Sequence, residues 1–251
     1  MPPLRVSPEP LELSLLGEFR LSVSGVCQVA LPGGARRLLT LLALRNRTVS
    51  REVAAGTLWP DVSQVHASAS LRVALCRLRS VSRWAVTATP HVITLAPDAT
   101  VDIEASRVVA QQVMDPDYRP SRSDGWGLRA IGALSADILP HWRQEWLLFE
   151  AESWRQVRLR ALEALAARLT AEERFADAAA AAMAAVAAEP LRETARASLI
   201  RVHLAEGNQS EAVREFHRYA DQLREELGLH PTPRLVEVMR DHGASATWAP
   251  A

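Results

Sequence analysis

Residues 58–81 read LWPDVSQVHASASLRVALCRLRSV, and the arrangement of roughly the first hundred residues depends on this run. Pro60 cannot continue a helix, so it ends one element, and the turn Asp61–Gln64 leads into the next. A helix is predicted from about Val65 to Val81, because its leucines recur at the i, i+4, i+7 spacing of an amphipathic helix. These inward positions are Leu71, Leu75 and Leu78.

The outward positions of this helix carry positive charge. Arg72 and Arg79 fall on or near the side opposite the leucines, with Ser68 and Cys76, and Arg77 lies near the edge of that side. No acidic residue interrupts the run from 62 to 81. The major groove of DNA is about 12 Å wide and admits one helix, so this element is predicted to be a recognition helix.

In the residues before this helix, apolar and polar side chains alternate first with period two and then with a helical period. Residues 11–31 predict two or three short strands, with turns at Gly17 and at Ser24-Gly25. A helix is expected over Ala35–Arg45, and Ser50 is a good N-cap for a second, short helix that ends near Trp59.

After the recognition helix, Trp84–Thr87 and Val92–Leu95 predict a β-hairpin. The order of sheet, helix, helix, longer helix and hairpin is that of a winged helix-turn-helix with an added N-terminal sheet. The hairpin would be the wing, placed along the DNA backbone or the minor groove.

Charge is distributed unevenly along the chain, although the formal net charge is zero. Residues 33–84 hold nine arginines against two acids, a net of +7, whereas residues 111–251 hold 17 arginines against 21 acids, a net of −4. A basic segment of this kind is typical of a nucleic-acid surface, and the alternative is a solvated basic face. All 29 basic residues are arginine, so every phosphate contact would use a guanidinium.

From residue 101 onward the pattern is helical, with helices expected over Val101–Met114, Leu128–Leu139 and about Arg143–Thr170. The polar, Pro- and Gly-rich run 115–127 between the first two is predicted to be a mobile loop. The segment LGLHPTP at 227–233 ends the last long helix and precedes a short final one.

A period of 34 residues is present in the C-terminal half. The residues Leu165, Ala178, Ala182 and Ala185 are matched 34 positions later by Leu199, Ala212, Phe216 and Tyr219. This period predicts tetratricopeptide-like helix pairs, and the alternative is a generic alanine-rich bundle. The fold class is therefore mainly α, with a winged helix-turn-helix domain at 11–98, a helical domain at 101–242, and tails at 1–10 and 243–251.

The motifs in both halves resemble those of one bacterial family. The run LWPD (58–61) and the pattern Ala69-x-Leu71-Arg72-x-Ala74-Leu75 resemble the DNA-binding domain of the SARP-type antibiotic regulators. The stretches EWLLFEAE (145–152), AAEPLRETAR (187–196) and EELGLHPTPRL (225–235) resemble their bacterial transcriptional activator domain. The segment 80–92 departs from the family, because it lacks the Gly-Gly-Tyr pattern often seen at the wing.

The resemblance implies a cytoplasmic, nucleoid-associated activator of a biosynthetic gene cluster. It implies binding of double-stranded DNA at direct promoter repeats as a side-by-side pair or homodimer, and contact with the RNA polymerase holoenzyme.

Ten residues are candidates for DNA contact. Arg72 is the candidate for reading a base edge, and Arg77 and Arg79 are candidates for phosphates, unless one of them pairs with Glu52 or Asp61. The other candidates are His66, Ser68 and Ser70 at the start of the recognition helix, Arg36 and Arg37 at the start of the first helix, and Arg83 and Thr89 of the hairpin. Ser68 has the alternative role of a helix cap, and Arg36 and Arg37 that of a solvated helix start.

Enzymatic and membrane functions find no support in the sequence. Gly33-Gly34 does not continue into a phosphate-binding loop, the seven histidines show no metal-ligand spacing, and no cofactor motif is present. Cys27 and Cys76 are read as reduced thiols, and neither a membrane span nor a signal peptide is expected. The alternative to a DNA-binding regulator is an adaptor whose helical repeats bind a protein and whose winged helix is a protein-contact module.

Overall fold

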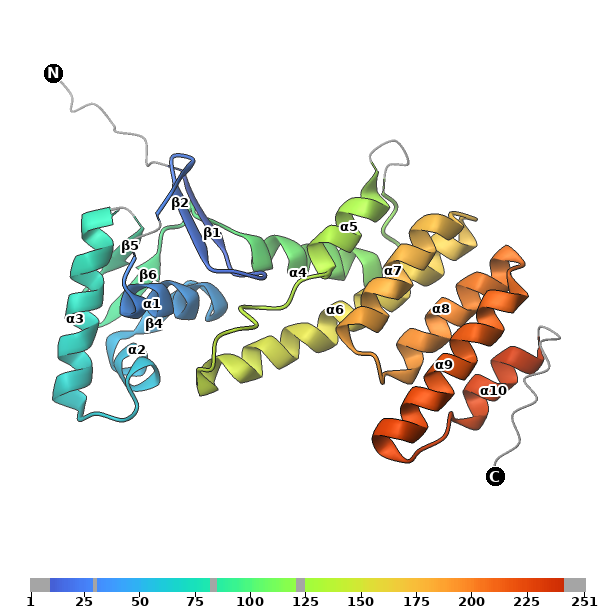
Figure 1. Ribbon diagram of the computed structural model, residues 1–251. Coiled ribbons are helices and arrows are strands. Elements are labelled where there is room, and N and C mark those ends of the chain that lie inside the picture. The colour runs from blue at the N-terminus through green and yellow to red at the C-terminus, as the bar shows by residue number, and fades with distance from the viewer. Residues whose placement is uncertain (1–9, 29–30, 82–84, 121–124, 242–251) are drawn as a thin grey trace, which may run out of the picture. The chain divides into compact units, whose positions relative to one another are not determined.

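The computed structural model describes residues 10–28, 31–81, 85–120 and 125–241 (Figure 1). Within these residues the chain forms two compact units. The first is drawn from Met1–Ala105 and Asp137–Glu152, and the second from Ser106–Ala136 and Ser153–Ala251. The predicted fold class is confirmed, since small sheets in the N-terminal part are followed by a helical C-terminal part.

The first unit begins with a four-stranded sheet in the order β3-β2-β1-β7. Its strands are β1 (Leu11–Ser14), β2 (Arg20–Val23), β3 (Val26–Cys27) and β7 (Thr100–Val101). Strands β2 and β3 are joined by Ser24-Gly25, both with positive φ, as a tight two-residue hairpin turn requires. Strand β7 pairs in parallel with β1, so the chain returns to the first strand after the three helices and the hairpin.

Three helices and a second sheet complete the winged helix-turn-helix. They are α1 (Gly33–Leu44), α2 (Arg51–Leu58) and α3 (Gln64–Val81), with a sheet in the order β4-β6-β5. The strands of this sheet are β4 (Thr48–Ser50), β5 (Val86–Ala88) and β6 (Val92–Leu95). The three helices pack on one another, and Leu38, Leu42 and Leu78 are completely buried among them.

The structure defines the start of α2 and the bounds of two strands more closely than the sequence did. Ser50 caps α2 as expected, because its hydroxyl accepts a hydrogen bond from the backbone N–H of Val53 at 3.2 Å. Thr48–Ser50, expected only as an extended link, is a strand because it pairs with β6. The first strand of the wing begins at Val86, two residues after the predicted start, and Trp84 lies outside the described residues.

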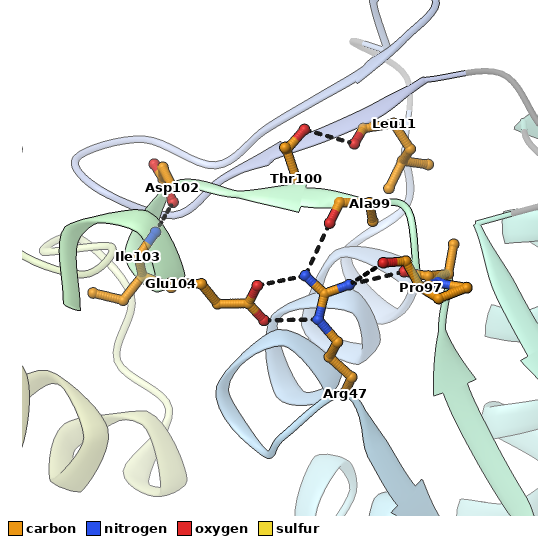
Figure 2. Close-up of polar contacts among 9 residues, drawn as sticks. Leu11, Arg47, Pro97, Ala99, Thr100, Asp102, Ile103 and Glu104 are labelled. Carbon is orange, nitrogen blue, oxygen red and sulfur yellow. Dashed lines mark hydrogen bonds and ion pairs between the residues drawn. The ribbon is translucent and has the colours of Figure 1, made fainter. Parts of the chain in front are cut away.

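The chain between the hairpin and helix α4 (Asp102–Met114) is fixed by two acidic side chains (Figure 2). The Asp102 carboxylate accepts hydrogen bonds from the backbone N–H groups of Leu15, Leu16 and Ile103 at 2.8–3.0 Å. Glu104 binds the guanidinium of Arg47, which comes from the turn after α1. The start of α4 is thereby tied to the first sheet and to the helical core of the same unit.

The predicted helix over Leu128–Leu139 is too long. Helix α5 (Trp126–Leu134) ends earlier, because residues after it pair with the chain that follows β1. Ile138 forms a bridge with Leu16, and the backbone N–H of Leu139 donates to the carbonyl of Leu15 at 3.0 Å. The first two residues of α5, Trp126 and Gly127, belonged to the predicted loop 115–127, so that loop is also shorter than expected.

The second unit consists of helices. They are α5, most of α6 (Glu145–Ala171), α7 (Phe175–Ala188), α8 (Glu193–Glu206), α9 (Gln209–Leu227) and α10 (Pro233–Arg240), together with the later residues of α4. Helices α7 to α10 lie side by side in Figure 1, with α8 packed against α7, α9 and α10.

The 34-residue period is present in three dimensions. Helix α7 begins at residue 175 and α9 at residue 209, a spacing of 34. All four pairs of matched positions are buried: Leu165 and Leu199, Ala178 and Ala212, Ala182 and Phe216, Ala185 and Tyr219. Successive helix pairs, α6 with α7 and α8 with α9, therefore use equivalent residues for packing, as in tetratricopeptide-like repeats.

Candidate nucleic-acid interface

Helix α3 has one buried stripe and an otherwise open surface. The buried side chains are Ala67, Leu71, Ala74, Leu75 and Leu78. They pack against α1 and α2, and this is the inward face expected from the leucine spacing. The remaining residues of the helix are exposed or half-buried.

The candidate side chains lie along the two edges of the open surface. At about 100° per residue, Ser68, Arg72 and Arg79 fall on one edge. His66, Ser70 and Arg77 fall on the other. Between them runs a mostly apolar strip that includes Val65 and Val73, which are 76% and 60% exposed. A helix inserted into a groove would thus have basic residues on both sides and small apolar ones at the centre.

The three arginines of α3 are exposed and carry no internal partner in the part of the chain that the structure describes. Arg72, Arg77 and Arg79 make no hydrogen bond or ion pair there through their guanidinium groups. The alternative that one of them pairs with Glu52 or Asp61 finds no such contact among the described residues. These charges are available to an external anion.

At the N-terminal end of α3, Ser63 interacts with the side chain of His66. The Ser63 Oγ lies 2.7 Å from the Nδ1 of His66, and the Ser63 carbonyl accepts from the backbone N–H of Ala67. Because the helix begins at Gln64, Ser68 lies inside it and is not its N-cap. Ser68 and Ser70 are both half-buried.

The two arginines at the start of α1 differ in their surroundings. Arg37 donates to the carbonyl of Leu58 at 3.4 Å, and its guanidinium lies 5.6 Å from the ring centroid of Trp59. Arg37 therefore connects α1 to the end of α2. Arg36 is exposed, and its guanidinium has no partner within the described ranges.

The tip of the wing is held by internal hydrogen bonds. The Thr89 hydroxyl accepts from the backbone N–H groups of His91 and Val92 at 3.3 and 3.1 Å. Arg51, at the start of α2, donates through Nε to the Thr89 carbonyl at 2.7 Å. Sequence reasoning missed this role of Arg51, because nothing local in the sequence links residue 51 to residue 89. Arg83 lies outside the described residues.

Other kinds of site are not indicated. Over the described ranges, no group of three or more His, Cys, Asp or Glu side chains is arranged to hold a metal ion. In the same residues, no helix is both long and apolar enough to cross a membrane.

Comparison with known proteins supports the family prediction. Residues 126–241 match the family model of the bacterial transcriptional activator domain. This match confirms the resemblance to SARP-type regulators that the sequence predicts.

Among solved structures, the fold is similar to that of "Mycobacterium tuberculosis EmbR in complex with low affinity phosphopeptide". The TM-score is 0.73 at 22% sequence identity, over 96% of this chain and 67% of that chain. At this identity the likeness concerns the fold. No match was found among curated proteins.

Proposed function

We propose that this chain binds specific DNA sequences and regulates transcription from them, because residues 126–241 match the family model of the bacterial transcriptional activator domain. The winged helix-turn-helix at 11–98 is the proposed DNA-binding domain, and the helical residues 101–242 are the proposed activator domain. The proposal assigns the chain no enzymatic activity.

One observation carries the proposal. Three arginines project from the open surface of α3 and have no internal partner among the described residues. Helix α3 buries its leucines against the rest of the unit and leaves these guanidinium groups unpaired, so its open surface can bind a polyanion. Arg72 is the proposed base-reading residue, since arginine to guanine is the commonest specific contact.

The remaining candidates are assigned to the backbone of DNA. Arg77 and Arg79 are proposed to bind phosphates on either side of the groove, with His66, Ser68 and Ser70 near the start of α3 in support. Arg36 is proposed as a further phosphate contact. Arg37 and Thr89 already have structural partners, so their contact with DNA would add to those roles.

The proposed partners are those that the resemblance to SARP-type regulators implies. We propose that two copies bind side by side on direct promoter repeats, and that the activator domain contacts the RNA polymerase holoenzyme. The target would be a biosynthetic gene cluster, and the place of action the cytoplasm, at the nucleoid.

The test is DNA binding by the full chain as a function of salt. Genomic fragments retained by the protein would be sequenced to give the operator, and affinity for operator and random duplexes would be measured over a range of salt concentrations. For a DNA binder, log affinity falls by about 0.9 per tenfold increase in salt for each phosphate contacted. Absence of salt-dependent DNA binding would favour the protein-binding adaptor instead.

A further inference from the structure

We propose that the segment His141–Arg143, far beyond the predicted DNA-binding domain in sequence, extends its surface with a site for a DNA backbone phosphate. The site is formed by Arg36, His141 and Arg143 beside the start of α1. The inference rests on the proposed DNA-binding function and adds residues to it that the sequence did not indicate.

The segment is held within the first unit by backbone and aromatic contacts. The backbone N–H of Gly17 donates to the Asp137 carbonyl at 2.8 Å, and that of Leu139 donates to Leu15 at 3.0 Å. Trp142 stacks on Phe19, with ring centroids 5.9 Å apart. These contacts fix the backbone on both sides of His141.

The residues after the segment are fixed as well. Leu147 is buried, and Glu150, in the first turns of α6, forms an ion pair with Arg45 at the end of α1 at 3.4 Å. Arg143 therefore starts from an anchored backbone, with contacts before and after it. An arginine on such a backbone loses less conformational freedom on binding than one on a free loop.

A hollow of about 440 Å³ lies between this segment and the start of α1. Its described lining contains four basic side chains and no acidic one: Arg36, Arg37, His141 and Arg143. Arg36 and Arg143 are exposed and have no side-chain partner within the described ranges. Two acids, Asp61 and Glu145, line an adjacent hollow that Arg37 and Arg143 also border, so the positive field is concentrated on the α1 side.

The first turn of α1 adds to this field. Helix α1 has 12 residues and no side-chain cap at its N-terminus. Gly33, in this first turn, lines the hollow, so an anion bound there is stabilised by the positive end of the helix dipole as well as by the basic side chains.

The hollow continues into the surface of α3. On its other side, Arg37 borders a second hollow, of about 400 Å³, lined also by His66, Ser70 and Arg77. Arg37 thus borders both hollows, and basic side chains lie along them from His66 and Arg77 on α3 to Arg143. With α3 in the major groove, the phosphates bordering the groove would follow these side chains, and backbone contacts make up half to two-thirds of protein–DNA hydrogen bonds.

The experiment compares Arg143→Gln, Arg36→Gln and Arg143→Lys with the unchanged full chain. The control is Arg160→Gln, which removes the same charge from an exposed position on α6 that lies outside the hollow. Each glutamine variant at the hollow is expected to weaken binding to operator and random duplexes by the same factor. Each is also expected to make the negative slope of log affinity against log salt shallower by about 0.9, the value for one lost phosphate contact. Arg143→Lys and Arg160→Gln should keep the original slope.

The alternatives separate clearly. An Arg143→Gln variant with the slope of the unchanged protein overturns the inference, while salt-dependent binding by the unchanged protein would still support the proposed function. Titration of the DNA-free protein with inorganic phosphate tests the alternative that the hollow binds a free phosphate ion and not the DNA backbone. Phosphate binding that depends on Arg143, together with an unchanged DNA slope, would assign the hollow to a free anion and overturn the DNA assignment.

Discussion

Arg47 and Glu104 join the helical core of the first unit to the start of α4 through both carboxylate oxygens. The Arg47 Nε donates to Oε1 of Glu104 at 3.0 Å, and Nη2 binds Oε2 (Figure 2). The same guanidinium donates to the carbonyls of Ala96, Pro97 and Ala99 at 2.9–3.0 Å. One side chain therefore binds three of the four backbone carbonyls between β6 and β7.

Replacing Arg47 with alanine should destabilise the first unit by about 2 kcal/mol, because three carbonyls and a carboxylate lose a charged donor. The measurement is urea unfolding followed by tryptophan fluorescence. Arg20→Ala is the control, since Arg20 is 67% exposed and forms a surface ion pair with Glu18 at 3.5 Å. A loss for Arg47→Ala no greater than that of the control, about 0.5 kcal/mol or less, would show that the network is not stabilising.

Arg72→Ala should relax sequence specificity. An arginine that reads a guanine contributes about 1–3 kcal/mol at one base position, so the variant should tolerate changes at that position which the unchanged protein rejects. Affinity would be measured for the operator and for each of its single-base variants. An equal loss on operator and random DNA would exclude a base-reading role.

Arg77→Ala should act differently, although both residues are on α3. Arg77 lies on the opposite edge from Arg72 and borders the second hollow, of about 400 Å³, which Arg37 also lines. Its loss should weaken binding to all DNA sequences alike. It should also make the negative slope of log affinity against log salt shallower by about 0.9. A preserved slope, or a loss confined to the operator, would contradict the phosphate assignment.

Local sequence patterns were sufficient for the elements that depend on near neighbours. The leucine spacing in 65–81 predicted which face of α3 is buried, and Ser50 predicted the start of α2. The 34-residue period predicted the buried positions of α7 to α9, because each repeat packs against the next with equivalent residues.

Features that depend on pairing between residues far apart in the sequence could not be predicted from local patterns. The helix predicted to Leu139 ends at Leu134 because the following residues pair with Leu15 and Leu16, more than a hundred positions earlier. The same pairing places Arg143 in the lining of the hollow that Arg36 also borders. Nothing in the local sequence of 135–143 signals it, since a single isolated bridge is too short to produce a period-two pattern of side chains.

The buried pair of Arg196 and Glu215 should be the most sensitive point of the second unit. Both side chains are about 95% buried, and Arg196 also donates to the carbonyl of Pro190 at 3.0 Å and to Gln222 at 2.8 Å. Glu215→Gln leaves buried arginine charge without its partner and should cost about 3 kcal/mol in the free energy of unfolding. Glu211→Gln, on the same helix but half-exposed beside Arg214, should cost less than about 0.5 kcal/mol. Equal losses would mean that the pair contributes no more than a surface ion pair.

Tyr219 makes the free energy of unfolding depend on pH in the alkaline range. Burial, followed by the nearby charge of Glu193, raises the pKa of Tyr219 from 10.0 to about 12, although Arg196 acts in the opposite direction. The folded state holds the phenolic proton more tightly than the unfolded state. The contribution is therefore complete below pH 10 and is lost as pH rises through about 12.

Because the chain has two tyrosines, Tyr118 and Tyr219, the ultraviolet absorbance of tyrosinate reports this titration directly. Tyr219→Phe should remove the component near pH 12 and flatten the loss of stability between about pH 10 and 12. At neutral pH it should cost about 1 kcal/mol, since the Tyr219 hydroxyl donates to the Leu191 carbonyl at 3.3 Å. Tyr118→Phe is the matched control and should leave the component near pH 12 in place. If the alkaline loss of stability were the same in Tyr219→Phe as in the unchanged protein, another group would have to be its source.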